Sequence, residues 1–423
     1  MTLLTRNPWG VLAVLVVIHV LAHVDRNVLL GFSPQITREL QLSDTQFGFL
    51  VGAVWVLSFG VMALIFGSLA DRFSRPRIIA VGMLVWSVCT AASGLAESFG
   101  GMVAGRFFVA TGEAALVPAA TGLLTEMFDP RRRGTAIGIF FVGIPLGIGL
   151  AFVLSGTLGS SWGWRGTFMA LGGAGIAISL AVALMREDRT RASHERGHAF
   201  LSQMQATLRA LSERREIALT IAGFVLVHAV FVGFAFLQLW LVRERGLEAG
   251  SIARQVGLVQ MIFGTLGAVV GGSLGDRLCG KLRGGHATFM AMLVAICVPL
   301  VVALRLSAPG SAFFFAGLAA MAFLPLSLYG SALAIIQGGM PVSMRSTVAG
   351  FTMMCINVIA IACGNLAAGA ASDALARWGY ASPLTAVLLG LDALAACSIV
   401  FFLAAAKRTR AEANRARELG LEI

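Results

Sequence analysis

The chain has 423 residues, of which 57% are hydrophobic and only 13% are charged, and its mean hydropathy is +0.85. Soluble domains carry about 25% charged residues and less than about half apolar ones. The composition therefore excludes an ordinary soluble domain and predicts an integral membrane protein. In such a protein the net charge of +11 reports on membrane topology and does not indicate nucleic-acid binding.

Apolar stretches follow one another along the chain, each long enough to cross a hydrocarbon core of about 30 Å as a helix. We expect twelve spans, at 9–31, 46–70, 77–96, 100–125, 134–158, 165–185, 217–242, 252–275, 286–305, 311–339, 346–372 and 382–406. The 50 glycines suit helices that pack closely in lipid. The prediction is an all-α membrane protein.

The two halves of the chain repeat. GSLADR (67–72) closes the second span and GSLGDR (272–277) closes the eighth, while RGTAIG (133–138) opens the fifth and RSTVAG (345–350) opens the eleventh. Duplicated six-helix halves are typical of transporters that rock about a central site. We therefore predict two pseudo-symmetric six-helix bundles around a central cavity, with an amino-terminal bundle at 1–185, a linker at 186–216, a carboxyl-terminal bundle at 217–406 and a tail at 407–423.

Arginine and lysine are distributed unequally between the two sets of connections. The set that includes both termini carries most of them, which predicts that this side is cytoplasmic and that the protein lies in the cell (inner) membrane. Arg305, at the end of the ninth span, is counted on the opposite side.

The linker contains His194-Glu-x-x-His198, the spelling of a zinc-protease helix. A zinc site needs a third ligand and a rigid scaffold, whereas this stretch is cationic and Gly197 weakens a helix between the two histidines. We therefore expect no metal and no cofactor here. The following residues, 199–216, predict an amphipathic helix along the membrane surface.

Four charged residues lie well inside apolar spans: Asp25 and Arg26 in the first, Arg106 and Glu113 in the fourth. A charge at this depth costs at least about 3 kcal/mol unless it is paired or faces water. Arg106 and Glu113 are two helical turns apart, on one face. We interpret the four as an electroneutral site in which Asp25 and Glu113 bind protons. The alternative is a static ion network that joins two helices.

Other polar residues in the spans give weaker signals. His19 and His23 are four residues apart on the first span, and either a relay or packing explains them. For His228 we favour packing. Asp392 lies in the twelfth span, and the sequence names no partner for it. Asp71, at a span end, is expected to latch a loop to arginines.

The stretch GSLADRFSRPR (67–77) resembles the signature loop of the major facilitator superfamily, and GSLGDR is similar to its degenerate second copy. Within that superfamily, HVDRNVL (23–29), RFFVATGEAALVPAATGLLTEMF (106–128) and FFVGIPLGIGL (140–150) resemble the spinster family. The resemblance implies a twelve-helix fold and the export or release of lipid-like molecules such as lysophospholipids. It also implies that Asp25, Arg26, Arg106 and Glu113 line the cavity. Its signature loops imply gating residues at Gly67, Asp71, Arg72, Arg75, Asp276 and Arg277.

The resulting hypothesis is a secondary transporter, not an enzyme, that moves a small amphipathic or anionic molecule by alternating access, coupled to protons. Arg26, Arg106, His19 and His23 are the candidate substrate-binding residues. We expect a monomer with the lipid bilayer, protons and the substrate as its partners, and no nucleic acid. No ATP-binding motif is present, so a gradient or the substrate itself must supply the energy.

Three alternatives remain open on sequence. An organic-anion (sugar-acid-like) proton symporter of the same superfamily carries a similar pattern, but the apolar FVGFAFLQLW (231–240) favours an amphipathic substrate. An intramembrane enzyme would need a metal cluster or a nucleophile and base. A sensor would need an output domain.

Overall fold

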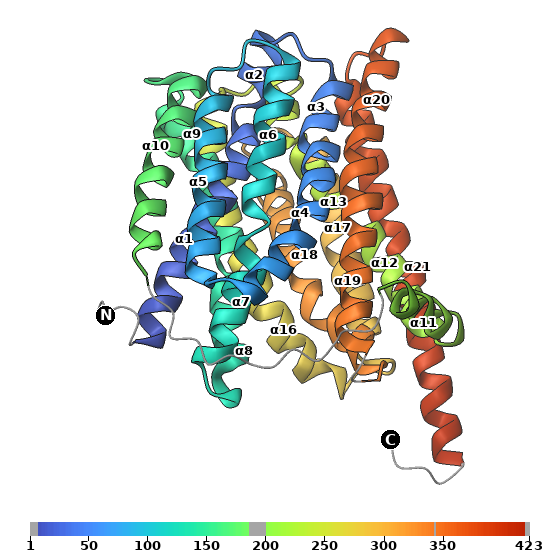
Figure 1. Cartoon of the computed structure of the whole chain (residues 1–423). Helices are drawn as coiled ribbons and strands as arrows, with labels where there is room; N and C mark the ends of the chain where they lie inside the picture. Colours follow the sequence, from blue (N-terminus) through green and yellow to red (C-terminus); the bar gives the residue numbers. More distant parts are fainter. Residues whose placement is uncertain (1–6, 186–199, 342–343, 419–423) are drawn as a thin grey trace. The chain divides into compact units, whose positions relative to one another are not determined.

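The computed structural model describes residues 7–185, 200–341 and 344–418, and within these ranges every regular element is helical (Figure 1). Twelve stretches in the described residues are long and apolar enough to cross a membrane, which confirms the predicted number. Their bounds are Pro8–Gly31, Asp44–Met62, Arg75–Ser93, Phe99–Met127, Pro130–Leu158, Gly163–Ala183, Arg215–Ala235, Ala249–Cys279, Gly285–Leu306, Ala312–Gly338, Thr347–Arg377 and Pro383–Ala411.

The helices of the first half begin at local capping signals. Asn7 accepts a hydrogen bond from the backbone of Trp9 at the start of α1, and Ser43 and Gln46 form a reciprocal capping box at the start of α3. The helices are α1 (Pro8–Gly31), α2 (Ser33–Glu39), α3 (Asp44–Val51), α4 (Ala53–Arg72), α5 (Arg75–Ser93), α6 (Phe99–Glu113), α7 (Leu116–Met127), α8 (Pro130–Phe141), α9 (Gly143–Leu158) and α10 (Gly163–Ala183).

The second half is less regular. Its helices are α11 (Phe200–Glu213), α12 (Arg215–Val227), α13 (Ala229–Ala235), α14 (Leu237–Arg243), α15 (Ala249–Val259), α16 (Thr265–Cys279), α17 (Gly285–Leu306), α18 (Ala312–Gly338), α19 (Arg345–Cys355), α20 (Gly364–Arg377) and α21 (Pro383–Glu418). π-Helical segments, η2 (Gln260–Gly264) and η4 (Ile356–Cys363), interrupt the eighth and eleventh spans.

Two compact units make up the chain. The first contains residues 1–191, 235–261 and 365–384, and the second contains 192–234, 262–364 and 385–423. The division between the units falls at the end of the seventh span, within η2 in the eighth span and directly after η4 in the eleventh. The division of the chain at 186–216 stays a prediction.

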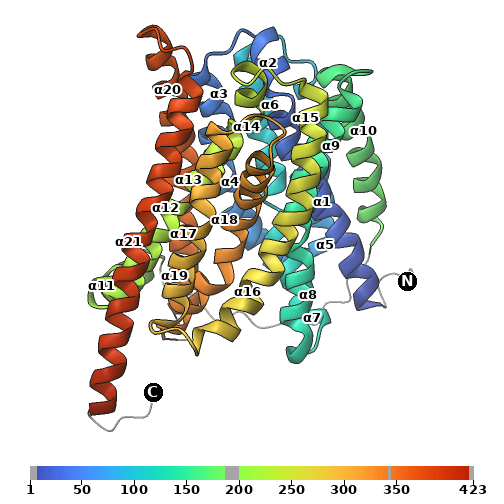
Figure 2. The same ribbon diagram turned by 180° about the vertical axis from the view of Figure 1, so that it is seen from behind.

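Glycines bring helix backbones together in the first unit. A side chain on Gly149 of α9 would meet the backbone of Gly257 on α15, and one on Gly156 would meet the carbonyl of Gly250. The two helices run side by side, as Figure 2 shows. The backbones of α3 and α20 are equally close at Gly48, where a side chain would meet the carbonyl of Asn365. Small residues permit such close approach in lipid, where packing supplies much of the association energy.

The helix bounds bear on two of the sequence predictions. A helix, α11 (Phe200–Glu213), occupies the stretch that was expected to be amphipathic, and its place along the membrane surface stays a prediction. Arg305, at the end of the predicted ninth span, lies within the last turn of α17 and is 1% exposed. The His194–His198 pattern lies outside the described residues.

Candidate functional site

The charged residues of spans one and four come together inside the first unit. Asp25 on α1 is 3% exposed, and Arg106 and Glu113 on α6 are each 6% exposed. Asp25 lies within electrostatic reach of both residues on α6, and Arg26 lies within reach of Glu113. The depth of these charges in apolar spans predicted the cluster, but the sequence did not predict which side chains contact one another.

Arg106 holds the backbone of α1. Its Nη1 donates to the carbonyl of Asp25 at 2.8 Å, and its Nη2 donates to the carbonyl of Arg26 at 2.9 Å. Two charge-assisted bonds from one planar guanidinium fix the position and orientation of this turn of α1 relative to α6. Arg106 therefore sets where the side chains of the neighbouring acidic and basic residues point.

Arg26 and Glu113 meet through a tryptophan. The Arg26 guanidinium carbon lies 3.4 Å from the centre of the Trp55 ring, and the indole nitrogen of Trp55 donates to Glu113 Oε2 at 2.9 Å. Trp55 also stacks on Phe59, with ring centroids 4.3 Å apart. A cation above an indole face whose N–H points at a carboxylate forms one connected unit. Trp55 could not be identified from the sequence, because a tryptophan in an apolar span gives no signal beyond packing.

Two buried polar atoms of this cluster have no hydrogen-bond partner among the described residues, Glu113 Oε1 and the Nδ1 of His23. The indole of Trp86 on α5 lies beside the Asp25 carboxyl group. Trp86 reaches the cluster because α5 and α6 cross closely at Gly82 and Gly112. Unsatisfied buried polar groups are costly and mark a place where a ligand, proton or water acts.

His19 and His23 differ in their surroundings. The Nδ1 of His19 lies 2.9 Å from the carbonyl of Phe140, and its ring stacks on the Phe140 ring with centroids 4.1 Å apart. The two histidine rings are 4.9 Å apart. Gly143 and Gly147 of α9 leave the room that these rings occupy, since a Cβ at either position would press on His19 or His23.

The predicted gating residues are only partly described. Arg75 makes a bidentate ion pair with Glu126 at the end of α7, with distances of 2.6 and 2.7 Å. The side chains of Gly67, Asp71 and Arg72 lie outside the described residues. In the second unit, Asp276 and Arg277 are exposed, and Asp276 lies 3.9 Å from His286.

The second unit supplies the partner that the sequence could not name for Asp392. Its carboxylate pairs with Arg305 at 3.1 Å, and both side chains are fully buried. His228 is held at both ring nitrogens, by the carbonyl of Phe224 at 2.6 Å and the hydroxyl of Tyr329 at 3.0 Å. These contacts join spans of the second unit to one another.

A further polar cluster closes one end of the first unit. Asp44 at the start of α3 pairs with Arg243 at 2.7 Å and accepts from Ser372 on α20 at 2.7 Å. Asp373 accepts from the backbone nitrogens of Asp44 and Thr45 at 3.0 and 2.9 Å. These hydrogen bonds and this ion pair connect the start of α3 to α14 and α20.

Between α2 and α10, Glu39 accepts from the indole nitrogen of Trp164 at 2.5 Å and pairs with Arg165 at 2.8 Å. The Trp164 bond, followed by the Arg165 contacts, lowers the pKa of the Glu39 carboxyl below its ordinary value of 4.5. This contact lies between spans and ties the α2 connection to the start of α10.

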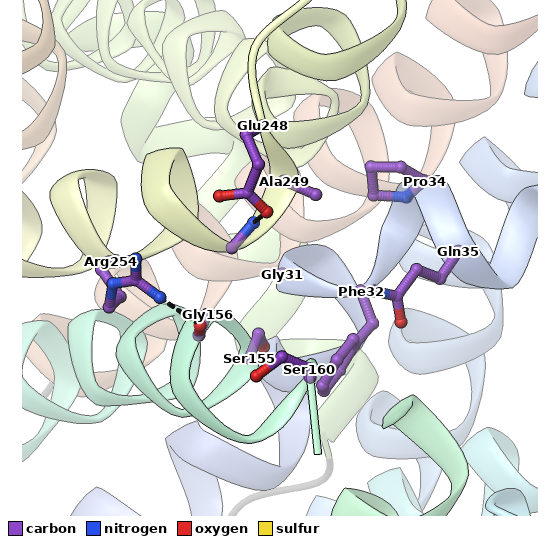
Figure 3. Close-up of a pocket in the computed structure, with 12 residues that line it drawn as sticks. Gly31, Phe32, Pro34, Gln35, Ser155, Gly156, Ser160, Glu248, Ala249 and Arg254 are labelled. Carbon is purple, nitrogen blue, oxygen red and sulfur yellow. Dashed lines mark hydrogen bonds between the residues drawn. The ribbon is translucent and has the colours of Figure 1, made fainter. Parts of the chain in front are cut away.

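Figure 3 shows a pocket of about 230 Å³ where α1 and α9 end and α15 begins. Its polar groups bond within the protein: Arg254 donates to the carbonyl of Gly156 at 2.6 Å, and Glu248 accepts from the first backbone N–H groups of α15. Those two bonds lower the pKa of the Glu248 carboxyl. The pocket lies beside the glycine contact of α9 and α15, and the sequence analysis did not anticipate it.

Twelve spans with a buried cluster of charges at membrane depth define a multi-pass membrane transporter. The chain matches the Major Facilitator Superfamily over residues 15–365 and belongs to it. No group of three or more potential metal ligands occurs in the described part of the chain. The family consists of transporters, so the prediction that the protein is not an enzyme is confirmed.

The chain is similar to several curated proteins. It is 27% identical to the protein spinster of Drosophila melanogaster over 70% of this chain and 50% of that protein. It is also 27% identical to an MFS-type efflux pump of Mycolicibacterium smegmatis (64% and 63%) and to the probable sulfoacetate transporter SauU of Cupriavidus necator (64% and 66%). The chain thus spans about half to two thirds of the length of these relatives. The resemblance to the spinster type is confirmed.

Solved structures share the fold. A bacterial homolog of the human lysosomal transporter Spinster, inward-facing and unoccupied, superposes with a TM-score of 0.78 at 23% identity, covering 95% of both chains. The nucleoside transporter NupG superposes with a TM-score of 0.74 at 14% identity, covering 93% of this chain and 99% of that one. The predicted all-α, twelve-helix fold of the superfamily is confirmed.

Proposed function

We propose that this transporter moves a small anionic, amphipathic molecule by alternating access and that protons on Asp25 and Glu113 drive the movement. The observation that supports this most is the connected unit of Arg26, Trp55 and Glu113, which joins a candidate anion-binding group to a candidate proton-binding group. The unsatisfied Glu113 Oε1 gives that carboxyl group an open position for a proton.

Coupling between the anion and the proton follows from the charge balance among Arg26, Trp55 and Glu113. Without substrate, the positive charge of Arg26 compensates the Glu113 carboxylate. An anionic head group that binds Arg26 draws on the same positive charge, so the carboxylate becomes easier to protonate. Anion and proton therefore load in the same step, which favours symport. Alternating access then requires that the loaded and empty states prefer different conformations.

The remaining residues take distinct parts in this proposal. Arg106 positions α1 through its two carbonyl contacts and reaches the substrate indirectly. Asp25 is a second proton acceptor, within electrostatic reach of Glu113. His23, with its unsatisfied Nδ1, contacts substrate, whereas His19 supports it by packing on α8 and α9.

Uptake into proteoliposomes with an imposed pH gradient tests the coupling. We expect Glu113→Gln and Asp25→Asn to abolish the response to the gradient, whereas exchange of labelled substrate without a gradient continues. Glu97→Gln removes an exposed carboxyl group on the connection before α6 and serves as the matched control. Full gradient-driven uptake by the Glu113→Gln variant would overturn the proposal for that residue.

The substrate class is tested with Arg26. Loss of one charge-assisted contact weakens anion binding by about ten- to a hundredfold, and Arg26→Gln should show this while Arg26→Lys recovers part of the affinity. The probe is a single-chain lysophosphatidic acid, whose phosphate and acyl chain match an arginine beside aromatic rings. Binding unaffected by Arg26→Gln would contradict the assignment.

A compact organic-anion:proton symporter is the second candidate, and the similarity to the probable sulfoacetate transporter favours it. Both candidates need Arg26, so they differ in the apolar part of the ligand. If sulfoacetate inhibits uptake of the labelled substrate at concentrations at which the lysophospholipid does not, the result would favour this alternative.

We also propose that Arg75 and Glu126 form part of a gating latch, together with Gly67, Asp71, Arg72, Asp276 and Arg277. The bidentate contact between α5 and α7 supports the part of Arg75. Both termini are proposed to lie in the cytoplasm and the protein to act as a monomer in the inner membrane. Protease digestion of a carboxyl-terminal tag in inside-out vesicles, but not in right-side-out ones, checks the orientation.

A further inference from the structure

The second unit contains a basic cavity that the transport mechanism does not use. It has a volume of about 350 Å³ and is lined by Arg215, Ala218 and Leu219 of α12 and by Arg408 of α21. Arg215 is the first residue of the seventh span, and Arg408 lies near the end of the twelfth. The cavity is therefore at the level where these two helices leave the hydrocarbon core.

The cavity has one polar and one apolar part. Arg215, Ala218 and Leu219 are spaced by three and four residues and so share one face of α12. Leu219, which lines the cavity, packs on the small buried residues Ala287, Ala405 and Ala406. The two arginines stand above this apolar part, toward the aqueous end of the helices.

The described part of the chain places no acidic partner on either arginine. Among the residues that the structure describes, the guanidinium groups of Arg215 and Arg408 have no ion pair or side-chain hydrogen bond. Both side chains are exposed, as are the adjacent Arg214 and Lys407. Glu213 is exposed and Glu216 is buried beside the cavity, yet neither forms an ion pair with either arginine in the described chain.

The chemistry of the cavity points to a lipid. Planar guanidinium groups bind phosphate oxygens in pairs, and basic pockets between spans at the cytoplasmic side suit anionic head groups. The apolar part of the cavity, formed by Ala218 and Leu219, matches the glycerol backbone and the first methylenes of an acyl chain. A free anion would gain nothing from this apolar part.

We propose that Arg215 and Arg408 bind the phosphate of an anionic phospholipid from the surrounding leaflet, at a site separate from the transport cluster of Asp25 and Glu113. The lipid bridges the first span and the last span of the second half and stabilises their packing. This assignment rests on the described cavity and does not depend on the identity of the transported substrate.

The test uses the full-length protein in detergent, titrated with dihexanoyl phosphatidylglycerol, with dihexanoyl phosphatidylcholine and with inorganic phosphate, and reads binding by native mass spectrometry and thermal stability. We expect phosphatidylglycerol alone to bind and to raise the melting temperature. Removing both arginines in R215Q/R408Q should weaken that binding by about tenfold or more. The lysine variant R215K/R408K should recover part of it, because the charge remains.

A matched control removes two exposed arginines from α8, in R131Q/R132Q, and changes the net charge by the same amount. The control should bind phosphatidylglycerol as the native protein does. Equal lipid affinity of R215Q/R408Q and the native protein would overturn the proposal, and so would equal stabilisation by inorganic phosphate. A folded double variant is verified by its size-exclusion profile and helical circular dichroism.

Discussion

The fully buried ion pair between Arg305 and Asp392 gives the sharpest stability prediction. The two groups are 3.1 Å apart, and both side chains are completely excluded from solvent. At this distance their attraction is about 5 kcal/mol with an effective dielectric constant of about 20. The cost of burying both charges offsets most of it, so the pair as a whole contributes little net stability.

Breaking the pair from one side has a much larger effect. The Asp392→Asn variant removes the carboxylate that pairs with the Arg305 guanidinium, which lies near Met321, Leu388 and Gly233. Arginine cannot shed its proton, so we expect destabilisation by about 3–5 kcal/mol. The reverse change, Arg305→Met, leaves a carboxyl group that can neutralise itself by taking up a proton, so its effect should be smaller.

Reversible unfolding in mixed micelles with increasing dodecyl sulfate measures these differences. The double variant Arg305→Met/Asp392→Leu should recover most of the lost stability, because it removes both charges and keeps an apolar fill. Asp276→Asn, at a carboxylate whose side chain is 78% exposed, is the control and should lie within about 0.5 kcal/mol of the native protein. The reasoning is refuted if Asp392→Asn behaves like this control, or if the double variant is as unstable as Asp392→Asn.

Three further predictions concern the first unit. Gly257→Leu should overpack the contact of α15 with the α9 backbone and lower the free energy of unfolding by about 1–3 kcal/mol or more. Gly138→Leu, whose added side chain meets open space, should not lower it, and thermal unfolding compares the two variants. Asp44→Asn should cost about 1 kcal/mol, and a double-mutant cycle with Arg243→Gln should show coupling of similar size. The Glu39 contact, whose folded pKa is lowered, should stabilise the protein fully above pH 4.5 and be lost as the pH falls through the folded pKa. Tryptophan fluorescence should follow this loss, and Glu39→Gln should remove the acid transition.

Hydropathy was sufficient to predict the twelve spans, because a helix that crosses lipid must be apolar over a fixed length. Arg305 gave no sign of a buried partner, because a charge near a span end looks like one that faces water. Its partner is 87 residues away in sequence, so no local pattern reveals the pair. Asp392 was therefore noticed as a buried carboxylate without an identifiable partner.

The cluster of Asp25, Arg26 and Glu113 was predictable for the same reason, since each charge stands out in an apolar run. Its aromatic members were not. Trp55 and Trp86 resemble ordinary packing residues in sequence, and only the close crossing of helices, at positions such as Gly112, brings them beside the charges. Sequence thus reports which side chains are costly to bury, whereas the groups that stabilise them depend on tertiary packing.

The π-helical segments have a mechanical consequence for two of the spans. η2 interrupts the eighth span and η4 interrupts the eleventh. A π-helical turn holds an extra residue, and sharp kinks of long helices occur at such turns. Bending of these two spans should therefore be concentrated at η2 and η4. Lengthening the surface connections would leave that bending unchanged, whereas a covalent staple across η2 or η4 would reduce it.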